Sequence, residues 1–122
     1  DVQTSGDQKV NYKLKNNLLV YANENLPNSI ELYIETIKNR KIKDKNNKNE
    51  IITYQIDLIS KIKMTIINEN KDVVFTISRS GDYSVGERNT LTLVNMKRTE
   101  QTLIDEITND ILNKLISIIN DL

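Results

Sequence analysis

The sequence predicts an α+β protein: a two-layer sandwich in which an antiparallel meander sheet is covered on one face by two helices. The first observation is the stretch Glu50 to Ile67, where apolar residues recur at almost every second position over an unusual length. The second is that segments with helical spacing precede and follow the strand-like part of the chain. The third is that short clusters rich in Asn, Asp and Gly separate the strand-like segments, as tight antiparallel turns require.

The long central strand presents one apolar face and one polar face. Its apolar positions are Ile52, Tyr54, Ile56, Leu58, Ile62, Met64 and Ile66. The residues between them are mostly polar, so one face is expected to pack against the helices and the other to remain in contact with water. A helix is excluded, because alternate positions would spiral around it instead of forming a stripe. The 122 residues are enough for one domain with a single core.

The N-terminal part predicts a helix preceded by a short polar lead-in. Asp7 is a suitable N-cap, because its carboxylate can accept hydrogen bonds from the exposed amides of the first turn. The apolar stripe that follows consists of Val10, Leu14, Leu18 and Tyr21. The breaker cluster Asn23 to Asn28 ends this helix. The lead-in Asp1 to Thr4 could add an edge strand, parallel to its neighbour and joined to it by a right-handed crossover.

Two further strands flank the central one. Residues Ser29 to Lys43 alternate, with Ile30 and Leu32 on the apolar face. Residues Val73 to Val85 alternate in the same way, and Gly81 is a candidate β-bulge among them. The connections are expected at Asp44–Asn49, Asn68–Lys71 and Gly86–Asn89.

The C-terminal part predicts one long amphipathic helix that contains an acidic residue on its apolar side. The stripe consists of Leu93, Met96, Leu103, Ile107, Ile111, Leu115, Ile118 and Leu122. A coiled-coil seam is the alternative, but one helix must still cover the sheet. Glu100 points in nearly the same direction as this stripe. Either Glu100 reaches solvent from a frayed first turn, or it is a buried carboxylate paired with a cation, and Arg79 or Arg98 is then the expected partner.

The composition argues against catalysis and against nucleic-acid binding. There is no His and no Cys, so thiol nucleophiles, histidine bases and Cys/His metal sites are excluded, and we expect no enzyme activity, no cofactor and no metal. Glu106 and Asp110 are one helical turn apart, and we interpret them as a solvated helix face. Seventeen basic and 17 acidic residues give a net charge of zero, so no nucleic-acid partner is expected. No apolar run reaches the roughly 18 residues of a membrane span.

Four segments carry a resemblance to a known family: Gly6–Leu18, Lys48–Phe75, Ser78–Val85 and Lys97–Leu112. Their order resembles the LptE family, the lipopolysaccharide-assembly lipoproteins of the Gram-negative outer membrane. The resemblance implies a single domain over residues 1–122, interpreted as a trimmed mature domain, because the family's lipidated N-terminal Cys is absent. It implies a non-catalytic protein on the periplasmic side of the outer membrane. This protein would plug the LptD β-barrel, support its assembly and bind lipopolysaccharide. The alternative is a generic periplasmic or cell-surface α+β interaction module.

The resemblance also points to one end of the sheet as a binding site. Alternate turns of a meander lie at the same end, so the Asp44–Asn49 and Gly86–Asn89 turns are expected to be neighbours. The cations gathered there are Lys41, Lys43, Lys45, Lys48 and Arg88. LptE-like proteins contact lipopolysaccharide through basic residues at such a tip, so these five are the candidate lipopolysaccharide-binding residues. A solvated lysine-rich hairpin is the alternative interpretation.

Overall fold

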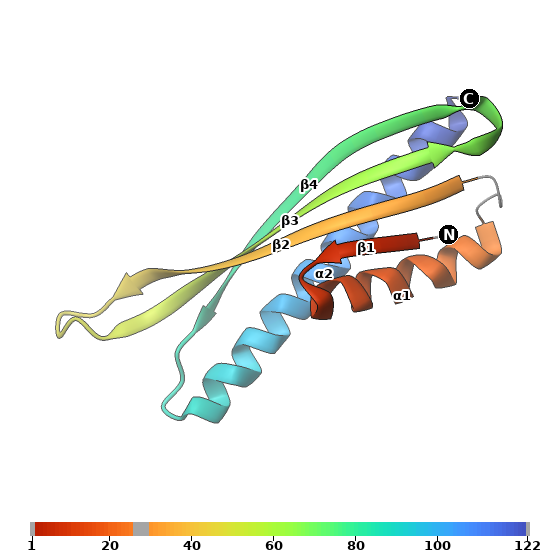
Figure 1. Cartoon of the computed structure of the whole chain (residues 1–122). Helices are drawn as coiled ribbons and strands as arrows, with labels where there is room; N and C mark the ends of the chain where they lie inside the picture. The colour runs from red at the N-terminus through yellow and green to blue at the C-terminus, as the bar shows by residue number, and fades with distance from the viewer. Residues whose placement is uncertain (1, 26–29, 122) are drawn as a thin grey trace.

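The computed structural model describes residues 2–25 and 30–121, and it confirms the predicted α+β architecture (Figure 1). A mixed four-stranded sheet packs against two helices. The elements are β1 (Val2–Gly6), α1 (Gln8–Asn25), β2 (Ile30–Lys45), β3 (Ile51–Ile66), a 3₁₀ turn (Ile67–Glu69), β4 (Lys71–Ser84) and α2 (Asn89–Asn120). The last three residues of the predicted breaker cluster, 26–28, and the stripe position Leu122 lie outside the described residues.

The strands follow one another across the sheet in the order β1-β2-β3-β4. The three long strands form the predicted antiparallel meander. The polar lead-in forms β1, which pairs in parallel with β2, as expected for an edge strand followed by a crossover helix. Asp7 caps α1 through its side chain, because Oδ1 accepts a hydrogen bond of 2.9 Å from the amide of Val10. The short N-terminal segment therefore belongs to the fold and does not lie loose beside it.

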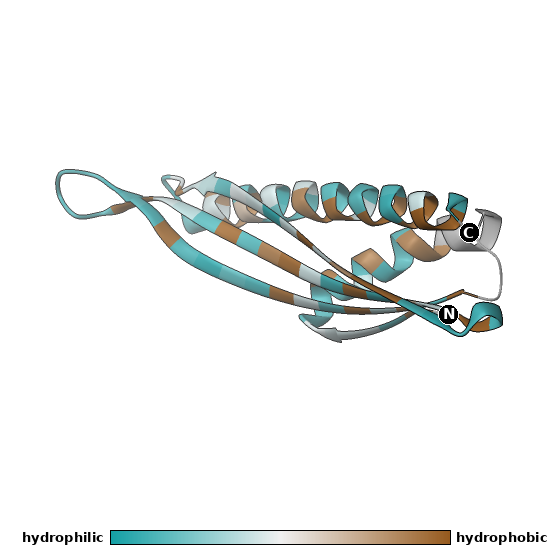
Figure 2. Cartoon of the chain, turned by 90° about the horizontal axis from the view of Figure 1, so that it is seen from above, coloured by the Kyte–Doolittle hydropathy of each residue, from teal (hydrophilic) through white to brown (hydrophobic). Residues whose placement is uncertain are grey.

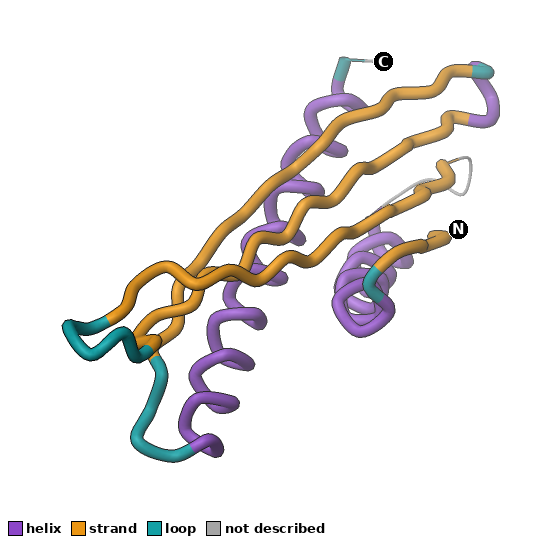
Figure 3. Tube along the Cα trace, turned by 60° about the vertical axis from the view of Figure 1, so that its left-hand side comes forward, coloured by secondary structure: helices purple, strands orange, loops and turns teal. Residues whose placement is uncertain are grey.

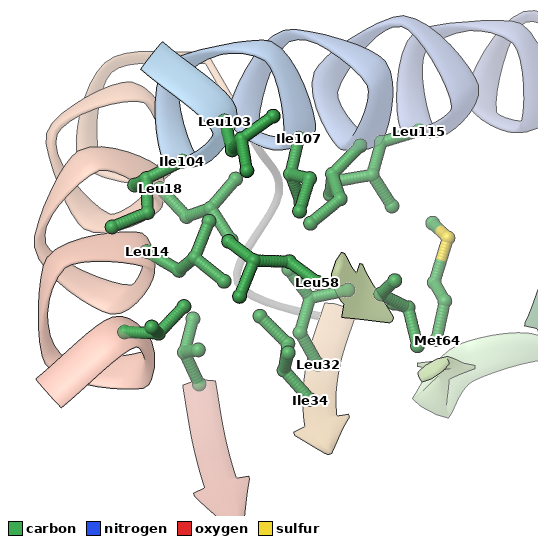
Figure 4. Close-up of a cluster of buried hydrophobic side chains, with 14 of the residues drawn as sticks. Leu14, Leu18, Leu32, Ile34, Leu58, Met64, Leu103, Ile104, Ile107 and Leu115 are labelled. Atoms are coloured by element: carbon green, nitrogen blue, oxygen red, sulfur yellow. The ribbon is translucent and has the colours of Figure 1, made fainter. Parts of the chain in front are cut away.

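The core lies between the sheet and the helices (Figure 4). Ile56, Leu58 and Ile62 of β3 are completely buried, which confirms the predicted face of the central strand. Leu14 of α1 and Ile107 of α2 pack into the same cluster from the helical layer. Burying a side chain of this size stabilises the fold by about 1.5–3 kcal/mol relative to leaving it in water.

Two glycines lie where neighbouring elements approach closely: Gly6 against the backbone of β2, and Gly81 against α2. The predicted bulge at Gly81 is wrong, because β4 pairs with β3 in unbroken register there. Instead Gly81 gives α2 room to approach, since a Cβ at this position would lie 2.9 Å from Cγ2 of Thr99. The irregularity lies in β2, where the register shifts between Ile42 and Lys45. Gly6 has φ +92° and faces the backbone of Thr36, so only glycine suits this turn into α1.

The helices cover the sheet unevenly. The amide of Asp7 donates to the carbonyl of Thr36, so α1 begins beside the middle of β2 and runs back toward Ile30. Figure 3 shows α2 running along the sheet under β3 and β4, while α1 lies only at the β1 end. The outer half of the β2–β3 hairpin therefore projects beyond α1. Ile52 was predicted to lie on the buried face, yet it is 40% exposed because no helix reaches it.

Candidate functional site

The β2–β3 turn and the β4–α2 connection lie at the same end of the molecule, which we call the tip (Figures 1 and 3). The amide of Val85 donates a hydrogen bond of 3.0 Å to the carbonyl of Ile52, which holds the β4–α2 connection against the hairpin. At the hairpin end, Oδ1 of Asn46 accepts from the amides of Lys48 and Glu50, at 2.9 and 3.0 Å. This Asx-type turn gives the hairpin end a fixed backbone.

Three of the five candidate cations are free at the tip. Lys45, Lys48 and Arg88 are exposed, and within the described part of the chain they form no ion pair. Lys45 and Lys48 flank the Asn46 turn, and Arg88 immediately precedes α2. These three positive charges therefore remain available to an anionic ligand.

The other two candidates, Lys41 and Lys43, already have acidic partners. Lys41 lies 4.0 Å from Asp57 of β3, and Lys43 forms an ion pair with Asp82 of β4. Hydrogen bonds from the Ser80 hydroxyl and then from the Gln55 amide hold the pKa of Asp57 below its ordinary value, and the charge of Lys41 lowers this pKa further. Sequence reasoning missed Asp57 and Asp82 as partners of these lysines, because only the register across three strands brings them opposite β2.

Apolar and aromatic side chains lie on the helix-facing side of the projecting hairpin, whereas Lys41 and Lys43 have the other strand parity and lie on the opposite side. Ile42 is 47% exposed, and neighbouring Ile52 is also exposed. Tyr54, opposite Ile42 in the register, stacks on Tyr83 with ring centroids 5.4 Å apart. The Arg40 guanidinium lies 4.7 Å above the Tyr54 ring as a cation–π contact. In Figure 2, brown apolar segments alternate with teal polar ones into the part of the hairpin that projects beyond the helices. The tip is therefore amphipathic.

Glu100 is buried, as the sharper of the two interpretations predicted, but its partner is a different residue. Its side chain is 2% exposed, and Oε2 lies 3.0 Å from Nζ of Lys38 in β2. The predicted partners are wrong: Arg98 is exposed, and Arg79 binds other acids. Lys38 has the same strand parity as the buried residue Ile34, so the alternation of β2 already placed it on the helix-facing side.

Arg79 joins the edge strand β4 to α2 and is not a buried charge. Its guanidinium donates to Asp110 at 2.7 and 2.9 Å and to Glu106 at 3.0 Å, and its side chain is 41% exposed. The hydrogen bonds to Asp110, and then its charge, raise the pKa of Arg79, and the same bonds lower the pKa of Asp110. The interpretation of Glu106 and Asp110 as merely solvated is therefore corrected: they anchor the strand to the helix.

Metal clusters and membrane-spanning helices were sought among the described residues. No three acidic side chains converge in a way that could hold a metal ion in the described part of the chain. Over the same residues, neither helix is long and apolar enough to span a bilayer.

Comparison with known proteins identifies the fold. No protein-family profile matches the sequence, and no curated protein matches it. Among solved structures, rare lipoprotein B from Shewanella oneidensis matches with a TM-score of 0.68 at 13% identity, covering 98% of this chain and 96% of the other. A lipoprotein from Caulobacter crescentus gives 0.69 at 11% identity, over 98% and 90% of the two chains. A minor lipoprotein from Acinetobacter baumannii gives 0.60 at 12% identity, over 93% and 90%. The chain thus shares, over nearly its whole length, a fold found in bacterial lipoproteins.

Proposed function

We propose that this chain is an LptE-like component of the outer-membrane lipopolysaccharide translocon. In this role it binds lipopolysaccharide at the tip, plugs an LptD-like β-barrel and supports the assembly of that barrel from the periplasmic side. In this proposal a lipid anchor attaches the protein to the membrane. The fold supports the proposal, since rare lipoprotein B is another name for LptE and shares this architecture from end to end.

The observation that carries the proposal is the amphipathic tip. Lipopolysaccharide presents phosphate groups next to acyl chains, so a binding surface needs cations beside apolar side chains. Lys45, Lys48 and Arg88 provide free positive charges, Arg through paired hydrogen bonds and Lys as a point charge. Ile42 and Ile52 provide exposed apolar area on the same hairpin.

The sheet face opposite the helices supports the barrel part of the proposal. Charged residues occupy this face, among them Glu35, Lys61, Lys63 and Asp72, and all four are exposed. The interior of a transmembrane β-barrel is polar, because lipid-facing and lumen-facing residues alternate along its strands. A rigid sandwich with a polar outer face is compatible with such a lumen.

Lipopolysaccharide binding to two charge-matched variants tests the tip. One variant replaces Lys45, Lys48 and Arg88 by Gln. The control replaces Lys9, Lys61 and Lys114 by Gln, three exposed lysines away from the tip, and so removes the same charge.

We expect the tip variant to lose at least about tenfold in affinity, which is ~1.4 kcal/mol, and to show a weaker salt dependence. The control variant is expected to bind nearly as the parent does. Equal losses in both variants would show that only net charge matters, and full binding by the tip variant would remove the tip as the site.

The barrel partner is tested separately by affinity purification from detergent-solubilised outer membranes. The proposal expects an LptD-like barrel to co-purify with the parent protein. If soluble periplasmic proteins are recovered and the barrel is not, the generic interaction module is the better description.

A further inference from the structure

The sheet has two open edges, one at each side. β1 is short and pairs with β2 only over residues 32–36, so the edge of residues 37–45 that faces away from β3 has no strand beside it among the described residues. β4 is the other outermost strand, and it pairs with β3 alone. Unpaired strand edges are templates for another strand, so natural proteins usually block them with charges, bulges or short lengths.

The β2 edge is blocked in this way. Five cations fall within the nine residues 37–45: Lys38, Arg40, Lys41, Lys43 and Lys45. A register irregularity between Ile42 and Lys45 adds a bend. A second strand approaching this edge would meet concentrated positive charge on a distorted backbone.

The β4 edge has none of these protections in its centre. Residues 73–78, VVFTIS, contain no charge and no proline, and four of the six are β-branched. The register with β3 is continuous along the whole strand, so this edge is regular. Val74 is 54% exposed, and Thr76 is exposed as well. A short, uncharged segment of high β-propensity at an edge has the composition of a strand that pairs with itself.

Side chains of α2 define where the open part of this edge ends. Oγ1 of Thr99 donates to the carbonyl of Asp82 at 3.1 Å, and Nδ2 of Asn95 donates to the carbonyl of Ser84 at 2.9 Å. These two carbonyls point away from β3 and are already bonded. Residues 71–81 therefore form the open edge, and residue 76 lies at their centre.

We propose that β4 pairs antiparallel with β4 of a second copy of this chain, around a two-fold axis at Thr76. In this register Phe75 of each copy lies opposite Ile77 of the other, on the helix-facing side, and no like charges face each other within residues 71–81. A register shifted by one residue pair would place Asp72 opposite Asp82. The groove between β4 and α2, about 670 Å³ and lined in part by Phe75 and Ile77, gives the facing apolar side chains room.

A second copy fits this edge better than a charged foreign strand, for three reasons. The central segment of β4 is uncharged, so it has no charge that could recognise an oppositely charged strand of another protein. The chain as a whole is neutral, so two copies do not repel each other. The pairing is isologous and consumes the open β4 edge in both copies. The other side of the sheet offers only the five-residue β1 and the blocked part of β2, so assembly stops at a dimer. The dimer contact uses the β4 edge, whereas the proposed barrel contact uses the sheet face opposite the helices.

Sedimentation over a range of protein concentrations tests the dimer, with two matched variants. In Thr76→Lys, the new lysine of each copy faces the same lysine of the other copy at the two-fold axis. Because the two positive charges repel each other, we expect the dissociation constant of the dimer to rise at least about tenfold. Thr4→Lys makes the same change on β1, the other outermost strand, where residue 4 is also exposed, and is expected to leave the dimer intact. A monomeric parent at all concentrations, or a Thr76→Lys variant that dimerises as the parent does, overturns the inference.

Cross-linking tests the register, because the parent has no cysteine. A short thiol-reactive cross-linker is expected to join two copies of Thr76→Cys, whereas Lys61→Cys, exposed on the central strand β3, is expected to stay monomeric. Equal cross-linking at both positions would overturn the β4 pairing. Lipopolysaccharide binding by Thr76→Lys is expected to match the parent, so a failure of the dimer and a failure of the tip site are told apart.

Discussion

Replacing Lys38 is expected to destabilise the protein more than replacing Glu100, although the two form one ion pair. Oε2 of Glu100 is bonded to Lys38, and Oε1 has no hydrogen-bond partner among the described residues. The Glu100 side chain is 2% exposed and that of Lys38 is 27% exposed. Without Lys38 the carboxylate stays buried and unpaired, whereas without the carboxylate the ammonium can still reach water.

The size of the effect follows from this asymmetry. Removing one partner of a buried pair costs about 3–5 kcal/mol, and partial access of water puts Lys38→Met at the lower end, about 3 kcal/mol. Glu100→Gln keeps the shape and an acceptor oxygen, so about 1 kcal/mol is expected. Removing both charges in the double variant Lys38→Met, Glu100→Leu is expected to be neutral or stabilising, because neither desolvation penalty remains.

Urea unfolding followed by circular dichroism at neutral pH measures these differences in the free energy of unfolding. The comparison requires that the slope of this free energy against urea concentration is the same in all variants. Lys61→Met is the control, because Lys61 is exposed on the same sheet and forms no ion pair among the described residues; it is expected to lie within about 0.5 kcal/mol of the parent. The reasoning is refuted if Lys38→Met behaves like this control, or if Glu100→Gln costs as much as Lys38→Met.

Three further predictions concern the core, the helix contact and the acid limit. Ile56→Ala is expected to cost about 2–5 kcal/mol of unfolding free energy, and Ile52→Ala clearly less, because only Ile56 is buried. Gly81→Ala is expected to cost about 1–3 kcal/mol; combining it with Thr99→Ser should reduce this loss, since the serine removes the methyl group that the new Cβ meets and keeps the hydroxyl. Hydrogen bonds from the guanidinium of Arg79 hold the pKa of Asp110 below its ordinary 3.8. The stability that these bonds contribute is therefore present above pH 3.8 and is lost as the pH falls through the lowered pKa. Asp110→Asn is therefore expected to be less stable than the parent at neutral pH, with the difference vanishing in acid; a difference that persists in strong acid would contradict this.

The strand and helix periodicities together were enough to predict the architecture. The period of two placed Ile56, Leu58 and Ile62 on the buried side, and helical spacing identified both helices. Parity states which face a residue occupies, but not whether another element covers it. Ile52 shares the parity of Ile56 and is nevertheless exposed, because the start of α1, which is fixed by Gly6, leaves that part of the sheet uncovered.

The site was only partly predictable, because charge pairing depends on lateral register. Meander geometry placed the tip cations near each other. The pairing of Lys43 with Asp82 spans two strand interfaces and 39 residues of sequence, which no local pattern reports. For the same reason the partner of Glu100 depended on how far α2 lies from β2, a distance that helical periodicity does not contain.

The tip and the described chain ends lie at opposite ends of the long axis (Figure 1). Val2 pairs with Leu32, near the start of β2, and the 16 residues of β2 then carry the chain toward the tip. At about 3.3 Å per residue this strand spans roughly 50 Å. Whatever precedes Val2 is thus joined to the end of the molecule that lies opposite the tip. Because continuous strands connect the two ends, fixing the position of Val2 keeps the tip about one strand length away from it. The length of the linker before Val2 then sets how widely the tip can move.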